Sequence, residues 1–199
     1  MLTTTTRLGP ADRGRRMTLD EFADAESTPG FHYELGRGVF AGVEVPNPSH
    51  ARMRHAVLRQ LYAYDAAYPS VIQLLGPSGT SKMLIEFFES ERHPDVAVYK
   101  TPAPSENRSA WGIWIPELAI EIVSPDSRDR DYNEKAEEYL QFGVEEYWIL
   151  DAELAEMLVH RRVGGVWQKQ TVKPPELYSA DVLPGLQFSC AAVFAAATK

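Results

Sequence analysis

The sequence is poor in the features that define several classes of protein. It has one cysteine, Cys190, which excludes an internal disulfide framework and a cysteine-based zinc site. Its apolar runs fall short of the roughly 18 consecutive residues of a membrane span. The segment that begins at Met1 has no apolar core of the kind that a secretory signal needs. We therefore expect a protein of a reducing compartment, the cytoplasm, with no membrane-embedded part.

Positive charge is also scarce. The chain has 28 Asp and Glu against 20 Lys and Arg, a formal net charge of −8, which argues against a nonspecific nucleic-acid coat protein. The acidity is concentrated in residues 117–156, which hold 13 acidic and three basic side chains. Basic clusters lie at 13–16 and 52–59. This distribution predicts weak, metal-assisted contact with any polyanion.

The composition otherwise fits a globular chain, with 44% hydrophobic and 24% charged residues among 199. Residues 1–16 are rich in Thr and Arg and lack periodicity, so they predict a flexible N-terminal arm. Residues 17–199 predict a single domain.

Helix and strand signals alternate along that domain. Thr18–Glu21 is a capping box that predicts a short helix, and Gly36–Gly38 predicts a hairpin turn. Ser49 is a suitable N-cap for a long helix. The pattern further predicts helices at 50–67 and 131–142, strands at 71–75, 83–88, 96–99, 118–123 and 146–150, a hairpin at 157–172, and a terminal helix capped by Ser189. A strand–helix–strand unit within a mostly β context predicts an α/β (α+β) fold with a mixed sheet flanked by helices.

Glu121 is the most informative residue, because it interrupts the apolar run of the strand predicted at 118–123. A buried carboxylate without a partner costs several kcal/mol or more. A metal ion or a basic side chain is therefore expected beside it. Asp95 leads into another short apolar strand and raises the same expectation.

Lys135 is the candidate basic partner. Around the helix predicted at 131–142, each residue advances the direction by about 100°. Lys135 then falls within the apolar arc, between Phe142 and Tyr139. The opposite face, expected to be solvated, contains Glu134, Glu137, Glu138 and Gln141. If the helix packs on the strand that carries Glu121, Lys135 points toward that carboxylate.

Two carboxylates and a lysine are the minimal set for metal-dependent hydrolysis of a phosphodiester bond. Carboxylates suit Mg²⁺ or Mn²⁺, and the metal lowers the pKa of bound water and neutralises negative charge. The lysine can orient that water or stabilise developing charge. We therefore predict Asp95 and Glu121 as metal ligands and catalytic residues, with Lys135 as a third catalytic residue.

Several motifs together resemble a known family. The motifs are Pro94-Asp95, Glu121-Ile-Val123-Ser-Pro, Asp131…Lys135…Tyr139, Gly143-Val-Glu-Glu-Tyr-Trp-Ile-Leu-Asp151, Thr18-Leu-Asp-Glu-Phe22, Tyr33-Glu-Leu-Gly-Arg-Gly38, His50 and Leu183-Pro-Gly-Leu186. Over most of residues 17–188 they resemble the Uma-two family of predicted restriction endonucleases, within the PD-(D/E)XK nuclease superfamily. The resemblance implies a restriction-endonuclease-like mixed sheet with helices on both sides, preceded by a helix–hairpin extension.

The resemblance also bears on individual residues. In the superfamily pattern a lysine follows the acid by two positions, but Val123 stands there. Relatives of this kind are thought to take the lysine from the following helix, and Lys135 fits that position. Glu34 and His50 match positions that the family would place near the site. We predict Glu34 as a further catalytic residue, and His50 and Arg52 as substrate-binding residues.

Each residue also has a structural interpretation. Glu121 and Lys135 could form a plain ion pair, Asp95 could cap a turn, and Glu34 could be an exposed acid. His50 could serve a local hydrogen bond, and Arg52 could belong to a solvated helix face.

Two functions follow from these alternatives. The first is a Mg²⁺- or Mn²⁺-dependent endonuclease that acts on nucleic acid, preferably DNA, and cuts both strands as a homodimer. The second is a catalytically inactive nuclease fold that serves as a binding or scaffold protein, with a salt-bridge cluster in place of the site. A two-carboxylate glycosidase is disfavoured because it gives Lys135 no role.

Overall fold

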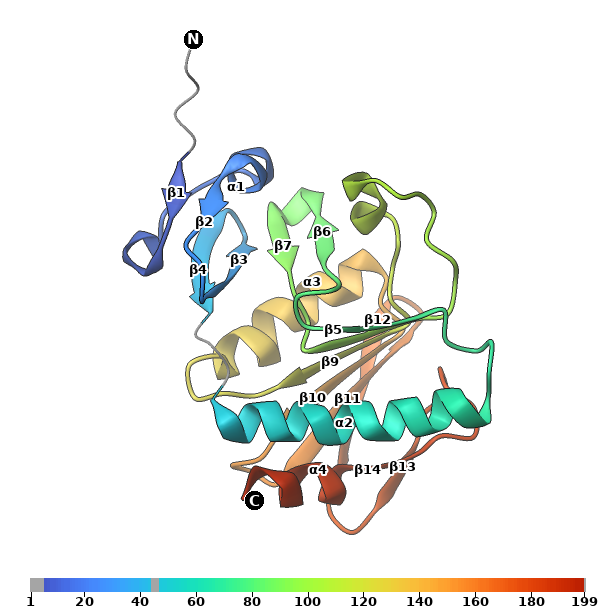
Figure 1. Ribbon diagram of the computed structural model, residues 1–199. Coiled ribbons are helices and arrows are strands. Elements are labelled where there is room, and N and C mark those ends of the chain that lie inside the picture. The colour runs from blue at the N-terminus through green and yellow to red at the C-terminus, as the bar shows by residue number, and fades with distance from the viewer. Residues whose placement is uncertain (1–5, 44–46, 199) are drawn as a thin grey trace.

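The computed structural model describes residues 6–43 and 47–198 (Figure 1). Its centre is a six-stranded mixed sheet in the order β12-β11-β10-β9-β8-β5. The strands are β5 (Leu74–Pro77), β8 (Val96–Tyr99), β9 (Leu118–Ile122), β10 (Glu146–Asp151), β11 (Glu156–Val163) and β12 (Val166–Val172). The neighbours β9 and β10 run parallel, whereas the other neighbouring pairs are antiparallel. The predicted mixed sheet flanked by helices is confirmed.

The parallel pair is joined by a helical crossover. A π-helical turn, Arg130–Glu134, leads into α3 (Lys135–Phe142), which ends at Gly143 with a φ of 106°. A positive φ of this size suits glycine, and the amide of Gly143 donates to the carbonyls of Tyr139 and Leu140. The helix predicted at 131–142 therefore exists, but its first turn is wider than an α-helical turn.

One face of the sheet is covered by α2 (Pro48–Ala67) and α4 (Cys190–Ala197). Side chains at alternate positions of the strands fill this layer, including Ile120 and Ile122 of β9 and Trp148 of β10. The opposite face is covered by α3, which packs on Ala119, Tyr147 and Ile149. The site described below lies on that second side.

A smaller antiparallel sheet, in the order β4-β3-β7-β6, lies beside α3. It combines the hairpin β3 (His32–Gly36) and β4 (Val39–Val43) with β6 (Met83–Ile85) and β7 (Ser90–Arg92). The remaining strands and α-helix are β1 (Arg7–Leu8), α1 (Leu19–Asp24), β2 (Glu26–Ser27), β13 (Leu177–Ser179) and β14 (Gln187–Ser189). Short 3-10 helices lie at Pro10–Asp12, Glu86–Phe88 and Arg108–Gly112. The predicted helix–hairpin extension is thus present as α1, β3 and β4.

The expected N-terminal arm is partly integrated into this extension. Strand β1 pairs with β2, and Leu8 is buried in a small core with Tyr33, Leu35 and Phe40. The prediction of a flexible arm is therefore wrong for the segment from Arg7. The single apolar residue Leu8 holds this segment in the core, and one isolated apolar residue produces no periodic pattern in the sequence. Residues 1–5 of that arm lie outside the described residues.

Two of the three N-caps predicted from the sequence are confirmed, and one is wrong. Thr18 and Glu21 form the predicted capping box, and Ser189 caps α4 as expected. The prediction that Ser49 caps the long helix is wrong: Asn47 is the N-cap, and its side chain accepts from the amide of His50. Pro48 occupies the first turn, where its missing N–H is harmless. In the described part of the chain, no helix is long and apolar enough to cross a membrane.

Candidate active site

Asp95 and Glu121 meet because β8 and β9 are antiparallel neighbours. Val96 pairs with Ile120, so Asp95 lies beside the end of β9. Its Oδ2 accepts a hydrogen bond of 2.8 Å from the amide of Ile122. The side chain of Glu121 projects to the α3 side of the sheet and is 4% exposed.

Lys135 reaches Glu121 from the first residue of α3. Its Nζ lies 2.9 Å from Glu121 Oε1, and the hydroxyl of Tyr139 donates to the same oxygen at 2.7 Å. Lys135 is 3% exposed, so its charge is withdrawn from solvent and held among carboxylates. The helical arc therefore located the direction of this lysine correctly.

Glu34 enters from the N-terminal hairpin. It is 3% exposed, and its Oε1 lies 3.4 Å from Lys135 Nζ and accepts from the amide of His93 at 2.9 Å. Its other oxygen, Oε2, is buried without a hydrogen bond and lies 3.5 Å from Arg92. The hairpin thus adds a third carboxylate to the two that the main sheet supplies.

Asp131 is a fourth carboxylate, and it was not among the predicted site residues. The π-helical turn sets Asp131 and Lys135 on the same side, with Oδ1 3.5 Å from Nζ. Ser127 donates to its Oδ2 at 2.5 Å. The family motif Asp131…Lys135…Tyr139 was the available signal. π-Helical turns of this kind are frequent at functional sites.

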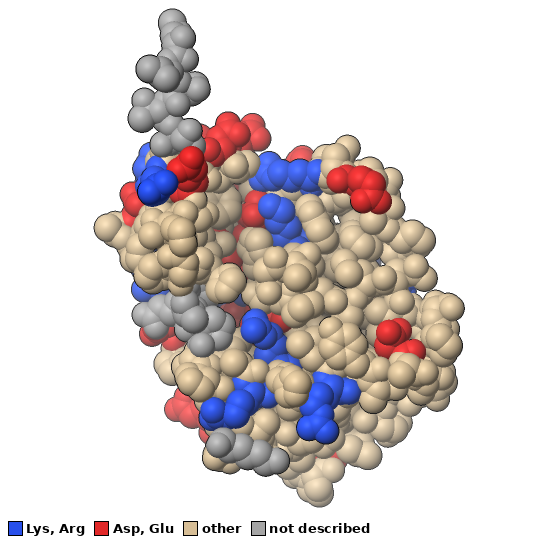
Figure 2. Space-filling view, viewed as in Figure 1, with Lys and Arg blue, Asp and Glu red and all other residues tan. Residues whose placement is uncertain are grey.

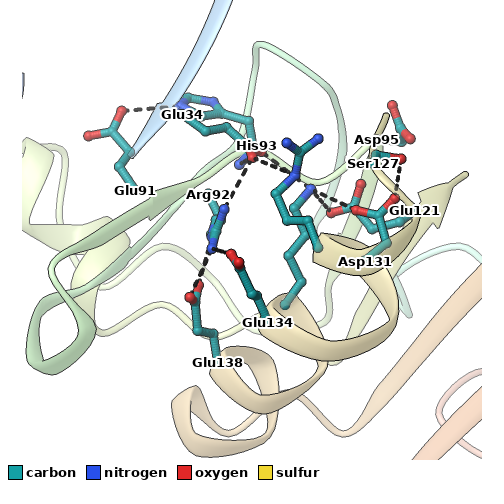
Figure 3. Close-up of polar contacts among 12 residues, drawn as sticks. Glu34, Glu91, Arg92, His93, Asp95, Glu121, Ser127, Asp131, Glu134 and Glu138 are labelled. Carbon is teal, nitrogen blue, oxygen red and sulfur yellow. Dashed lines mark hydrogen bonds and ion pairs between the residues drawn. The ribbon is translucent and has the colours of Figure 1, made fainter. Parts of the chain in front are cut away.

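Arg92 is a second residue that the sequence analysis missed. Its fully buried guanidinium binds both oxygens of Glu138, at 2.7 and 2.8 Å, and Glu134 at 3.2 Å (Figure 3). Glu138, expected on a solvated face, is therefore fully buried. A Cβ on Gly36 would lie 2.6 Å from the Arg92 guanidinium, so the glycine makes room for it.

His50 and Arg52 separate in the structure, although both belong to the first turns of α2. His50 Nε2 lies 3.0 Å from Asp95 Oδ2, so this histidine joins the group. Burial lowers the pKa of His50, but the hydrogen bond to Asp95 and the charge of Asp95 outweigh it and raise that pKa. Arg52 instead donates to the carbonyls of Ala196 and Ala197 at the end of α4. The structure does not bring Arg52 to the group.

The group has an excess of negative charge. Burial raises the pKa of Glu121 to about 8; Lys135 opposes the rise, and the nearby carboxylates of Asp131 and Asp95 add to it. Burial also raises the pKa of Asp131. For Glu34 the effect of burial is outweighed by Lys135, Arg92 and Arg130, which lower its pKa to about 2.

This excess fits a bound divalent cation. Two buried carboxylate oxygens, Glu34 Oε2 and Asp131 Oδ1, have no hydrogen-bond partner, and hard oxygen donors are what Mg²⁺ and Mn²⁺ take. A cation would also favour the ionised form of Glu121, whose pKa is raised by burial and by the nearby carboxylates. Among the described residues no three candidate ligands are already arranged around one point. Lys135 Nζ stands between the carboxylates instead.

The group lines a cavity of about 800 Å³ between the main sheet and the N-terminal extension. The lining includes Glu34, His50, Asp95, Glu121, Asp131 and Lys135. Figure 2 shows Lys and Arg side chains over the region where Figure 1 places α2, which begins at this cavity. Buried carboxylates and a lysine at the wall of an open cavity can bind a cation and stabilise negative charge on a ligand.

Comparison with known proteins identifies a family and a similar fold. The model of the Uma2 family, described as "Putative restriction endonuclease", matches residues 19–193. The crystal structure of a "putative nuclease belonging to DUF820" from Anabaena variabilis ATCC 29413 is similar in fold. It has a TM-score of 0.68 and 19% identity, over 91% of this chain and 99% of that chain. Among curated proteins none matches this sequence.

Proposed function

Because this chain belongs to the Uma2 family, we propose that it is a divalent-metal-dependent endonuclease that hydrolyses phosphodiester bonds, with DNA as substrate. The main support is the convergence of three carboxylates, those of Glu34, Glu121 and Asp131, on the buried lysine Lys135, with Asp95 at the wall of the same cavity. Glu34 comes from the hairpin, Asp95 and Glu121 from the main sheet, and Asp131 from the π-helical turn. An ordinary surface ion pair needs neither this burial nor this many partners.

Asp95 and Glu121 are the residues proposed to hold Mg²⁺ or Mn²⁺. They lie side by side at the end of β9, and Glu34 and Asp131 supply further negative charge next to them. When bound, such an ion lowers the pKa of a water molecule and neutralises charge on a phosphate.

The protein's own residues orient this pair. The amide of Ile122 and the ring of His50 both contact Asp95 Oδ2, which fixes the direction of its carboxylate. The hydroxyl of Tyr139 donates a hydrogen bond to Glu121 and so holds its carboxylate in position. We propose that Lys135 turns its ammonium group from Glu121 toward the phosphate or the attacking water, where it stabilises negative charge. Glu34 keeps that ammonium charged and in place.

A cut in both strands of a duplex needs two such groups. We therefore retain a homodimer as the proposed form for double-strand cleavage. A single copy suffices to nick one strand.

One observation favours a second candidate, a binding or scaffold protein without activity. Lys135 already satisfies Glu121 at 2.9 Å and contacts Glu34 and Asp131, as a purely structural salt-bridge cluster would. In that case divalent ions do not compete with the lysine. Metal binding therefore separates the two candidates before any substrate is known.

The test is cleavage of supercoiled plasmid with Mn²⁺ or Mg²⁺, together with calorimetric titration of Mn²⁺. The variants are Asp95→Ala, Glu121→Gln and Lys135→Met, with the exposed residues Glu145→Gln and Lys169→Ala as matched controls. We expect nicking by wild type and both controls, and a loss of roughly 100-fold or more in each site variant. We expect weaker Mn²⁺ binding in the two acid variants, and melting curves identify any variant that is unfolded.

Other outcomes point elsewhere. Full activity in folded Lys135→Met would remove the lysine from catalysis and leave the nuclease. Equal activity in all variants would indicate a contaminant. No cleavage and no Mn²⁺ binding in wild type would establish the scaffold candidate.

A further inference from the structure

The cavity is small compared with a nucleic-acid duplex. Its volume of about 800 Å³ lies in the range of small-ligand pockets, ~300–1,000 Å³. Glu121 and Lys135 are only 4% and 3% exposed, so a phosphate must enter the cavity to reach them. A whole duplex, whose major groove alone is about 12 Å wide, is larger than such a space. One nucleotide of a single strand fits into it.

Part of the cavity wall is aromatic. The N-terminal extension lines the cavity with Phe22, Phe31 and Tyr33. Phe22 and Tyr33 pack on Phe40 in the small core, but Phe31 is 42% exposed. Its ring lies 6.1 Å from that of Tyr33, which supports it from one side. An exposed, supported aromatic ring in a polar cavity is the usual platform for an unpaired base.

Cationic side chains lie on the same cavity. Lys82 and Arg108 both line it and both bind Glu91, at 2.9 and 3.1 Å. Two cations around one carboxylate leave a positive excess, which suits a phosphate of the strand. The extension comes close to this part of the molecule, since the ring of His32 is 3.8 Å from the Cβ position of Gly79. The aromatic side chains, the cations and the acidic group thus line the same cavity.

We infer that the cavity takes an unpaired nucleotide, from a single strand or a locally melted duplex, with its base stacked on Phe31. Its phosphates then lie between Lys82 and Arg108 on one side and Lys135 and Glu121 on the other. That the bound strand is cut rests on the proposed function. The preference for unpaired strands and the role of Phe31 concern binding and are tested without cleavage.

The experiment is fluorescence anisotropy at low salt, once with EDTA so that no cleavage occurs and once with Ca²⁺ in place of EDTA, because a divalent cation offsets the negative charge of the cavity. The probe is a fluorescein-labelled 15-nucleotide DNA strand, alone or annealed to its complement. Wild type is compared with Phe31→Ala, Phe31→Trp and Phe87→Ala; Phe87 is 67% exposed and lies away from the cavity. Melting curves establish that each variant is folded.

We expect the single strand to bind more tightly than the duplex. Phe31→Ala should weaken single-strand binding about 5- to 100-fold, the loss of one base–aromatic stack. Phe31→Trp and Phe87→Ala should bind as wild type does. Equal or tighter binding of the duplex, binding of neither probe, or unchanged affinity in Phe31→Ala would each overturn the inference.

The two proposals fail in different ways. Nicking of relaxed and supercoiled plasmid at equal rates, with tighter duplex binding, would overturn the unpaired-nucleotide site and leave the nuclease. Selective single-strand binding that depends on Phe31, without cleavage by wild type, would leave this site and remove the nuclease.

Discussion

The two faces of the six-stranded sheet are built from the same strands but hold different chemistry. On the side of α2 and α4, β9 contributes Leu118, Ile120 and Ile122 to an apolar layer. On the side of α3, the alternate positions of β9 contribute Ala119 and Glu121. On this side the apolar contacts with α3 border a cluster of charged residues. The cluster consists of Glu121, Lys135, Glu34, Asp131 and Arg92.

The difference shows how one sheet separates stability from function. Burial of apolar area stabilises the fold wherever it occurs, at about 25 cal/mol per Å². A buried cluster of charges gains much less net stability, because desolvation offsets the attraction between its members. The first face can therefore hold the sheet together while the second keeps groups that are costly to bury. Substitutions on the two faces should have different consequences.

Trp148→Ala should have one of the two largest effects on stability. Trp148 is fully buried on the apolar face, between Tyr178 and Phe188. Its removal leaves a large cavity and should lower the free energy of unfolding by ~3–5 kcal/mol. Urea denaturation measures this loss, and a loss below 1 kcal/mol would contradict the assignment of the apolar face as the main source of stability.

Lys135→Met should show the coupling within the charged face. It leaves Glu121, Glu34 and Asp131 without their shared cation, which should cost roughly 3–5 kcal/mol. Combined with Glu121→Gln, we expect the double variant to be more stable than the sum of the single losses predicts, by about 1–3 kcal/mol. By contrast, the losses of unfolding free energy caused by Lys135→Met and Trp148→Ala should add, because the two residues lie on opposite faces of the sheet. Strict additivity of Lys135 and Glu121 would contradict a direct interaction in solution.

His160→Phe should change the pH dependence of stability. His160 lies on the α3 side, between Tyr147 and Trp167, with both ring nitrogens buried and unpaired. Burial lowers its pKa from 6.5 to about 4, and Lys169 adds to this. The neutral form of His160 therefore makes its full contribution to the stability of the fold above pH 6.5. As the pH falls toward 4, the unfolded state takes up the proton first and stability is lost, by roughly 3 kcal/mol at 1.36 kcal/mol per pKa unit.

The variant should lack this part of the acid sensitivity. Melting temperatures of wild type and His160→Phe at pH 7 and pH 4.5 measure the difference. The exposed His55→Gln serves as the control and should follow wild type. Parallel pH profiles for wild type and His160→Phe would show that His160 is protonated without penalty.

Ser189→Ala should have the smallest effect. The Ser189 hydroxyl accepts from the amide of Ala192 at the start of α4, on the apolar side of the sheet. Its loss should cost ~1 kcal/mol, as for other N-caps. Thr18→Ala, at the capping box of α1, is the matched change in the extension. Chemical denaturation should show a decrease for each, and an increase for Ser189→Ala would contradict the assigned cap.

The sequence predicted what depends on periodicity and failed where partners are distant. Alternation along 118–123 and the helical arc at 131–142 were enough to direct Glu121 and Lys135 toward each other. Glu138 was expected in solvent because it falls on the polar face of the helix predicted at 131–142. It is buried, since the distant residue Arg92 binds it.

Distant partners also explain which residues of the candidate site the sequence did not predict. Asp131 enters through a π-helical turn that an ideal 100° step does not contain. Arg52 was assigned to substrate as a member of the basic cluster at 52–59 beside His50, but its guanidinium donates to carbonyls at the end of α4. Glu34 and His50 joined the candidate group through the family resemblance alone. Their contacts with Lys135 and Asp95 appear only once the hairpin and α2 are placed against the main sheet.

The hydrogen bond from the amide of Ile122 to Asp95 has a consequence for the interpretation of related sequences. The carboxylate of Asp95 completes the end of β9 where the pairing with β8 stops, so it is needed for folding as well as for the proposed chemistry. A relative that has lost activity is therefore under pressure to keep this aspartate, just as it is under pressure to keep the cation that Lys135 supplies to three buried carboxylates. Retention of either residue is by itself no marker of an active member.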